Sequence, residues 1–175
     1  MTAPPTPARD GDDGDWQQLL DGLRTYPATY TYVTHQLARW LGVHPADANA
    51  FAEVLYAEDR GDPLSPARLA ARISLSSGAT TSLLNRLERA GLVVRSREHA
   101  DRRIVTLRSV EAVTTRAWAF FEPLARRVED VRGQFTAEEL RTVGRFVTLL
   151  NEATTGAVAD NEARADSEPA PGPRA

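Results

Sequence analysis

The segment from Leu64 to Leu107 constrains the fold most, because its pattern predicts a helix, a turn, a second helix and a charged hairpin in succession. Ser65 followed by Pro66 is a strong helix start. The serine oxygen can accept an amide hydrogen that the first helical turn leaves unpaired, and proline has no amide hydrogen to leave unpaired. The first helix is therefore expected from Pro66 to about Arg72.

The second helix is predicted to open at a cap on Ser76 or Ser77 and to run to Ala90. Gly91 then ends it, because glycine enters the left-handed conformation without steric cost. Helical spacing separates an apolar side from a polar side. The apolar side holds Thr80, Leu83, Leu84 and Leu87, and the polar side holds Ser77, Gly78, Thr81, Ser82 and Asn85. Small polar groups can approach base edges closely in a major groove about 12 Å wide, so the polar side is a candidate DNA-reading surface. A plain capping turn is the alternative.

After Gly91 the pattern changes to two strand-like runs, Leu92 to Arg97 and Arg103 to Leu107, which predict a two-stranded wing. Arginines crowd the distal half of this hairpin, and such a loop beside a recognition helix can reach the minor groove or flanking phosphates. The complete set of candidate DNA-contact residues is Ser76, Ser77, Gly78, Thr81, Ser82, Asn85, Arg86, Arg95, Arg97, Arg102 and Arg103.

Three signatures in this order resemble the MarR-type winged helix-turn-helix transcriptional regulators: LSPARLAARISLS, LLNRLERAGLV and Asp101-Arg102-Arg103 at the wing. The resemblance implies a mainly α fold with a small β wing, and terminal helices that interlock two chains into a homodimer. Where family members often carry an aspartate that pairs with a wing arginine, this chain has Asn85. Where they carry a leucine-threonine pair before the next helix, it has Ser109-Val110, so Ser109 is expected to cap that helix.

Charge distribution supports a DNA partner although the whole chain is acidic, with a net charge of -3 and a pI of about 5.7. Residues 60–108 hold ten arginines against four acidic residues, a local charge of +6 that leaves -9 for the remainder. A basic module on an acidic body is typical of a protein that orients itself on double-stranded DNA.

Composition restricts the other classes of function. At 175 residues with 42% apolar content, the chain is long enough for one domain with a substantial core. No run approaches the ~20 apolar residues of a membrane span and no signal peptide is apparent, so we expect a cytoplasmic protein without a membrane partner. The absence of cysteine excludes disulfides and thiolate metal sites.

The domain organisation follows from composition and helical spacing. Residues 1–14 and 156–175 are predicted to be disordered tails, and residues 15–155 a MarR-like domain. Within it, the winged helix-turn-helix is expected at 47–108, between dimerisation helices at 15–41 and 109–155.

Pro27 should break or kink the first of these helices, Gly42 should end it, and Thr136 should begin a capping box with Glu139. The terminal helices carry surplus apolar residues, so we expect a homodimer, with a monomer that buries these stripes internally as the alternative.

An enzyme is disfavoured, because His35, His44 and His99 lie far apart and no nucleophile motif or phosphate-binding loop occurs. Each histidine is more simply a surface or packing residue, and no cofactor or metal is expected. The remaining rivals to a ligand-responsive repressor are a winged helix used for protein contacts and a DNA-binding regulator that responds to no ligand.

A small aromatic or anionic effector is a further expected partner, partly because many members of the resembled family respond to phenolic ligands at the junction of the dimerisation helices and the winged domain. Aromatic and polar side chains alternate there in this sequence, and apolar pockets with a few polar groups are the usual form of a ligand site. The candidates are Tyr30, His35, Arg39, Trp40 and Trp118. The alternative is that these rings only fill the core and the interface.

Overall fold

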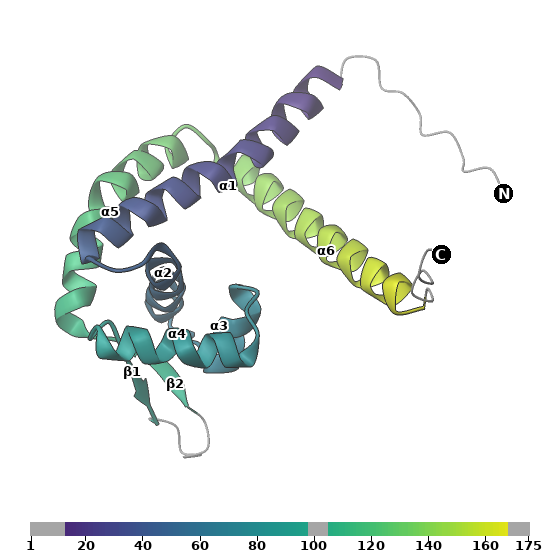
Figure 1. The fold of residues 1–175 in the computed structure, drawn as a ribbon. Helices are drawn as coiled ribbons and strands as arrows, with labels where there is room; N and C mark the ends of the chain where they lie inside the picture. The colour runs from purple at the N-terminus through teal and green to yellow at the C-terminus, as the bar shows by residue number, and fades with distance from the viewer. Residues whose placement is uncertain (1–12, 98–104, 168–175) are drawn as a thin grey trace. The chain divides into compact units, whose positions relative to one another are not determined.

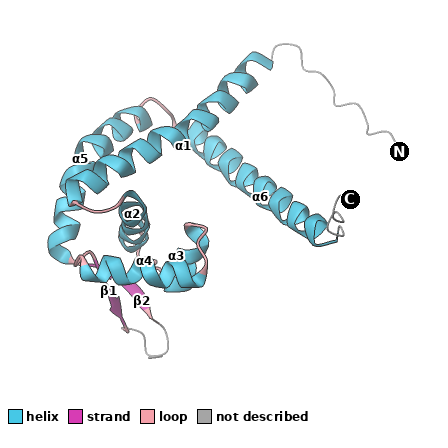
Figure 2. Ribbon diagram, in the orientation of Figure 1, coloured by secondary structure: helices cyan, strands magenta, loops and turns pink. Residues whose placement is uncertain are grey.

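The computed structural model describes residues 13–97 and 105–167, which form helices and one two-stranded sheet (Figures 1 and 2). The elements are α1 (Asp13–Leu41), α2 (Pro45–Asp59), α3 (Pro66–Arg72), α4 (Ser77–Arg89), β1 (Val93–Ser96), β2 (Thr106–Ser109), α5 (Glu111–Arg132) and α6 (Ala137–Ser167). This confirms the mainly α fold with a small β wing. The chain falls into two compact units, divided between Glu122 and Pro123. The expectations for the first twelve residues and for His99, Asp101, Arg102 and Arg103 lie outside the described residues.

Helix α2 is the centre of the first unit. It begins after His44, whose Nδ1 accepts a hydrogen bond from the Ala46 amide at 3.2 Å. Its apolar side chains are buried on several faces: Ala48, Ala50, Phe51, Ala52, Val54, Leu55 and Ala57. Helices α1, α3 and α4 and strand β2 all pack against it, and Figure 1 shows it between α1 and α4. The many alanines leave space for these neighbours to approach closely.

The predicted helix-turn-helix is confirmed in detail. Ser65 caps α3, and its hydroxyl accepts from the Arg68 amide at 3.3 Å. Ser76 caps α4, and its hydroxyl accepts from the Ala79 amide at 3.3 Å. Gly91 ends α4 with a φ of 66°, as its position predicts. Between the helices, Ser74 adopts a φ of 52°. The sequence does not predict this, because residues other than glycine rarely take this conformation.

The wing is an antiparallel pair in which Val93 lies opposite Ser109 and Ser96 lies opposite Thr106. Its second strand continues to Ser109, two residues beyond the predicted end, and β2 is bonded to the rest of the domain at Leu107 and Ser109. The Leu107 amide donates to the Leu64 carbonyl at 2.8 Å, and the Ser109 amide donates to Glu58 Oε2 at 2.8 Å. These bonds anchor the base of the wing to the segment before α3 and to α2.

The prediction that Ser109 caps α5 is wrong. Its hydroxyl donates to the Glu58 carboxylate and accepts from Thr114 Oγ1 at 2.7 Å, so Ser109 belongs to the sheet and bonds across to α2. Helix α5 instead begins one residue later, where the amides of Val113 and Thr114 both donate to the Val110 carbonyl at 2.9 Å.

Pro27 does not break α1, which is one helix from Asp13 to Leu41, so that half of the expectation is wrong, and the kink stays a prediction. A proline inside a helix removes a single backbone hydrogen bond, which packing and neighbouring bonds can offset. Thr31 Oγ1 donates to the Pro27 carbonyl at 2.8 Å, and further along α1 Leu37 and Ala38 are buried against the core. The helix ends at Gly42, with a φ of 75°, as expected.

In the second unit, the capping box at the start of α6 is confirmed. The Glu139 amide donates to Thr136 Oγ1 at 3.2 Å, and the Thr136 amide donates to Glu139 Oε2 at 2.8 Å. The helix then continues to Ser167, so the predicted disordered tail is wrong for residues 156–167. The reason is helix propensity: this stretch contains several alanines, the residue that favours a helix most.

Candidate nucleic-acid interface

The two sides of α4 are separated as the sequence predicts. Thr80, Leu83, Leu84 and Leu87 are buried, while Ser76, Ser77, Gly78, Thr81, Ser82 and Asn85 are exposed. The exposed side carries no acidic residue, and a Cβ added at Gly78 would meet no atom within 4 Å. The beginning of α4 therefore presents a small, uncharged and open surface on which another molecule can approach the backbone.

Two hydroxyls on this surface are already engaged in the helix itself. Ser76 Oγ accepts from the Ala79 amide, so Ser76 contributes as the cap of α4. Thr81 Oγ1 donates to the Ser77 carbonyl at 2.9 Å. No such bond joins the Ser82 hydroxyl to another described residue, so Thr81 and Ser82 offer different hydrogen-bonding groups on this face.

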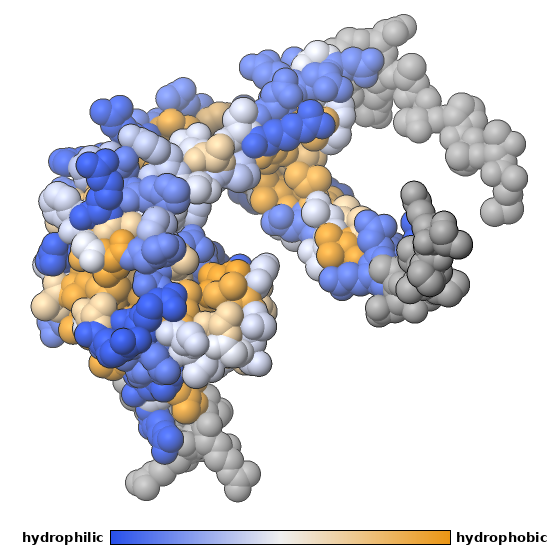
Figure 3. Space-filling model, viewed as in Figure 1, coloured by the Kyte–Doolittle hydropathy of each residue, from blue (hydrophilic) through white to orange (hydrophobic). Residues whose placement is uncertain are grey.

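The wing arginines that the structure describes differ in their partners. Arg95 forms an ion pair with Glu88 of α4, with 3.4 Å between Nη1 and Oε2. Arg97 is exposed, and no ion pair joins it to any other residue in the described ranges. In Figure 3 the visible face of the hairpin is mostly hydrophilic. Arg97 is thus the described wing arginine whose guanidinium is most available to a phosphate.

Arg86 differs from the other candidate residues because its guanidinium is bonded to α2. Its Nε donates to Asp47 Oδ1 and Oδ2 at 3.2 and 3.1 Å, and its Nη2 donates to Oδ1 at 2.7 Å. The Asp47 hydrogen bonds raise the pKa of the Arg86 guanidinium above its ordinary value. The sequence places Asp47 only at the start of a helix and gives no sign of this pairing, since Arg86 lies 39 positions away.

The five candidate effector residues do not converge. Tyr30 lies half-buried near Tyr56, and burial raises the pKa of the Tyr30 hydroxyl far above its ordinary value. Trp118 meets Tyr56 edge-on at 6.3 Å between ring centroids. The structure therefore joins Tyr30 and Trp118 through Tyr56, which sequence reasoning missed because α2 was assigned only to the winged domain.

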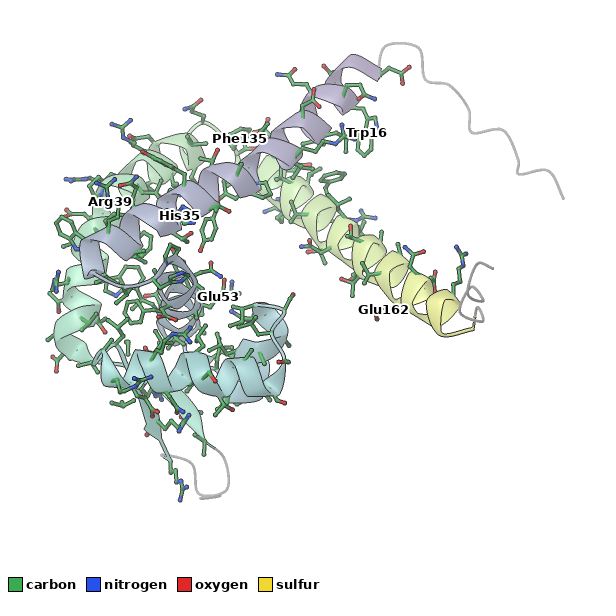
Figure 4. The ribbon with its side chains drawn as sticks, in the orientation of Figure 1. Trp16, His35, Arg39, Glu53, Phe135 and Glu162 are labelled. Carbon is green, nitrogen blue, oxygen red and sulfur yellow. The ribbon has the colours of Figure 1, made fainter. Side chains whose placement is uncertain are left out.

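The other three candidates lie elsewhere on the first unit. Trp40 contacts Phe120 at 6.1 Å, and its Nε1 donates to the Arg116 carbonyl at 3.3 Å, which is a packing role between α1 and α5. His35 and Arg39 are exposed on α1, and Figure 4 shows them apart from Glu53 on α2.

The remaining chemistry that the described residues offer is limited. Within residues 13–97 and 105–167, no group of three histidine, cysteine or carboxylate side chains is placed to hold a metal ion. Over the same ranges, no helix combines the length and the apolar character that crossing a membrane requires.

Comparison with known proteins gives the following similarities. Residues 53–105 match the model of the MarR family. The uncharacterized HTH-type transcriptional regulator YcgE of Bacillus subtilis (strain 168) is 33% identical over 120 residues, which cover 68% of this chain and 75% of that protein. The crystal structure of the transcription regulator MarR from Oenococcus oeni PSU-1 has a TM-score of 0.58 at 15% identity, covering 77% and 98% of the two chains. A MarR family protein from Bacillus stearothermophilus has a TM-score of 0.55 at 23% identity, covering 85% and 99%. At these identities the two solved structures show a shared fold alone.

Replacement of Arg97 by alanine is expected to weaken duplex binding by a similar factor on every DNA sequence. Loss of one phosphate contact should reduce the slope of log affinity against log salt by ~0.9. Fluorescence anisotropy over a salt series measures both quantities. The control is Arg145→Ala, which removes an exposed arginine of α6. A change in sequence preference with an unchanged slope would assign Arg97 to base reading instead.

Proposed function

Because this chain belongs to the MarR family, we propose that it is a sequence-specific DNA-binding repressor that acts as a homodimer on a pseudo-palindromic operator and responds to a small effector. Membership of the family makes the chain a DNA-binding transcriptional regulator. Its action as a repressor, its dimeric state and its response to an effector are what we propose. Chromosomal DNA is the target, so the proposal places this action in the cytoplasm.

The observation that carries the proposal is the exposed side of α4. A helix side facing water ordinarily carries long charged residues, but here Ser77, Gly78, Thr81 and Ser82 leave the surface small and uncharged. Such a surface can enter a major groove, and Arg97 on the adjacent wing can reach the phosphates beside it. In the proposed complex the base-reading residues are Ser77, Gly78, Thr81, Ser82 and Asn85, and the wing arginines, Arg102 and Arg103 included, contact the backbone.

Exposed apolar residues on the terminal helices support the homodimer. In the first unit, Trp16, near the start of α1 in Figure 4, is 43% exposed, and Tyr26 is 66% exposed. In the second unit, α6 exposes Val143, Val147, Leu149 and Val158, and Figure 3 shows hydrophobic residues along the visible face of this helix. Large exposed apolar patches mark interaction surfaces, and a second copy of the chain brings the same patches to the contact.

The group around Tyr56 supports an effector site. Tyr30 and Tyr56 supply hydroxyls within a half-buried aromatic setting, with Trp118 against the Tyr56 ring. Burial, and to a smaller extent the charge of Glu53, raise the pKa of both tyrosines. Apolar walls with a few polar groups suit a small aromatic molecule that carries a hydroxyl or an acid. In the proposed site the effector contacts Tyr30 and Trp118, whereas His35, Arg39 and Trp40 lie outside it.

Selection of duplexes from a random library is expected to return an inverted repeat with half-sites about 10 base pairs apart. Thr81→Ala and Ser82→Ala should each change the preferred base at a position of the half-site without changing the salt dependence, because they alter groove contacts and not phosphate contacts. Thr142→Ala is the matched control, since Thr142 is also an exposed helical threonine, bonded to Glu138. A selection that returns no common sequence would favour a winged helix used for protein contacts.

Joint replacement of Val143 and Val147 by aspartate should convert the dimer to a monomer, because charged groups would then enter the apolar contact. Light scattering at micromolar concentration measures the mass, and binding to full and half operators should become equal. Thr148→Asp, at an exposed position of the same helix, should leave the dimer intact. A wild-type monomer with equal affinity for both sites would refute the dimer.

A thermal-shift screen of phenols and aromatic acids is expected to find compounds that stabilise the free protein and weaken operator binding. A ligand can do both only through different affinities for two shapes of the protein, and a tenfold loss of DNA affinity needs ~1.4 kcal/mol of coupling. Tyr30→Phe should reduce both effects, while Tyr32→Phe, which changes an exposed tyrosine of α1, should not. If no compound does both, the protein is a regulator that responds to no ligand of this class.

A further inference from the structure

The Arg86 side chain crosses from α4 to the beginning of α2 and is bonded there at two nitrogens, Nε and Nη2. Asp47, the acceptor, lies in the first turn of α2 and is only 6% exposed. A carboxylate there is favoured by the helix dipole, but a charge so little hydrated also needs a hydrogen-bonded partner. Arg86 supplies this partner in a planar, two-point geometry that fixes orientation as well as distance.

The position of Arg86 on α4 allows its contact with Asp47 to restrict rotation of the helix. Arg86 lies at the edge of the exposed side, next in sequence to Asn85 on that side and to the buried Leu87. At the opposite edge of the same helix, Glu88 pairs with Arg95 of β1. The two ion pairs hold α4 from both edges, so rotation of α4 about its own axis would break one of them.

We propose that Asp47 and Arg86 form a positioning pair that sets the rotation of α4 and thereby aims Ser77, Thr81 and Ser82 at the base edges. Arg86 then acts through α4 and not as a phosphate contact, which changes the role expected for it from the sequence. The inference rests on the proposed DNA-reading function and adds Asp47, a buried acid, to the residues that determine specificity.

The substitution Asp47→Asn gives a test in which two explanations predict opposite signs. Removing a negative charge near the DNA-binding face should strengthen binding to every duplex if electrostatics alone decide. If the pair positions α4, Asp47→Asn should weaken binding to the selected operator by about tenfold, or ~1.4 kcal/mol. Its affinity for a random duplex should stay the same or increase. Asp59→Asn, an exposed charge-matched change on α2, should not lower operator affinity.

The double variant Asp47→Asn/Arg86→Gln separates positioning from phosphate contact, because it removes the pair without changing the net charge. The slope of log affinity against log salt should equal that of the wild type. A slope reduced by ~0.9 would show that Arg86 contacts a phosphate and would overturn the proposal. Equal weakening on operator and random duplexes would also overturn it. Circular dichroism and thermal melting without DNA establish that each variant is folded.

A measurement without DNA distinguishes failure of this inference from failure of the proposed function. In the free protein, the Arg86 Nε–H should exchange with water more slowly than the Arg97 Nε–H, as followed by NMR, and Asp47→Asn should accelerate it. Equal exchange of the two arginines in the wild type would refute the pair itself. If the Arg86 Nε–H exchanges slowly but the protein selects no DNA sequence, the contact between α2 and α4 is supported. The proposed function, and with it the role of the pair in orienting α4 towards the bases, would then be refuted.

Discussion

Burial of α2 on several faces is the constraint on which the winged unit depends. Phe51, Val54 and Leu55 are almost completely excluded from water, so α1, α3, α4 and β2 must pack around them together. Each element reaches this helix by its own contact: Leu69 and Leu87 through apolar packing, and Ser109 through hydrogen bonds to Glu58. The polar side of α4 faces outward because the other side of the helix packs against α2, α3 and β1.

The parts of this arrangement that follow from sequence are local. Ser65 and Ser76 cap helices within three residues of themselves, and Gly91 takes its left-handed conformation for steric reasons that need no partner. The alternation of Thr80, Leu83, Leu84 and Leu87 with polar residues likewise encodes which side of α4 is buried. Short-range chemistry was therefore sufficient to define the helix-turn-helix and the class of surface that it presents.

The parts that sequence reasoning missed depend on contacts between distant positions. Ser109 has the side chain of a helix cap, but Glu58, which lies 51 positions earlier, binds both its amide and its hydroxyl. Arg86 has the charge of a phosphate contact, but Asp47 occupies its guanidinium. Both contacts join residues that lie far apart in the sequence, so they follow from the packing of α2 and not from residue type alone.

The hydrogen bond from Thr81 to the Ser77 carbonyl also limits what α4 can recognise. Its hydroxyl hydrogen is directed into the helix, so the outward surface of Thr81 consists of a methyl group and oxygen lone pairs. Amino groups of adenine or cytosine and the thymine methyl complement this surface, whereas the guanine O6 and N7 acceptors do not. In the proposed complex, this intrahelical bond would remove a hydrogen-bond donor from the surface of α4 and would disfavour guanine at a base that Thr81 contacts.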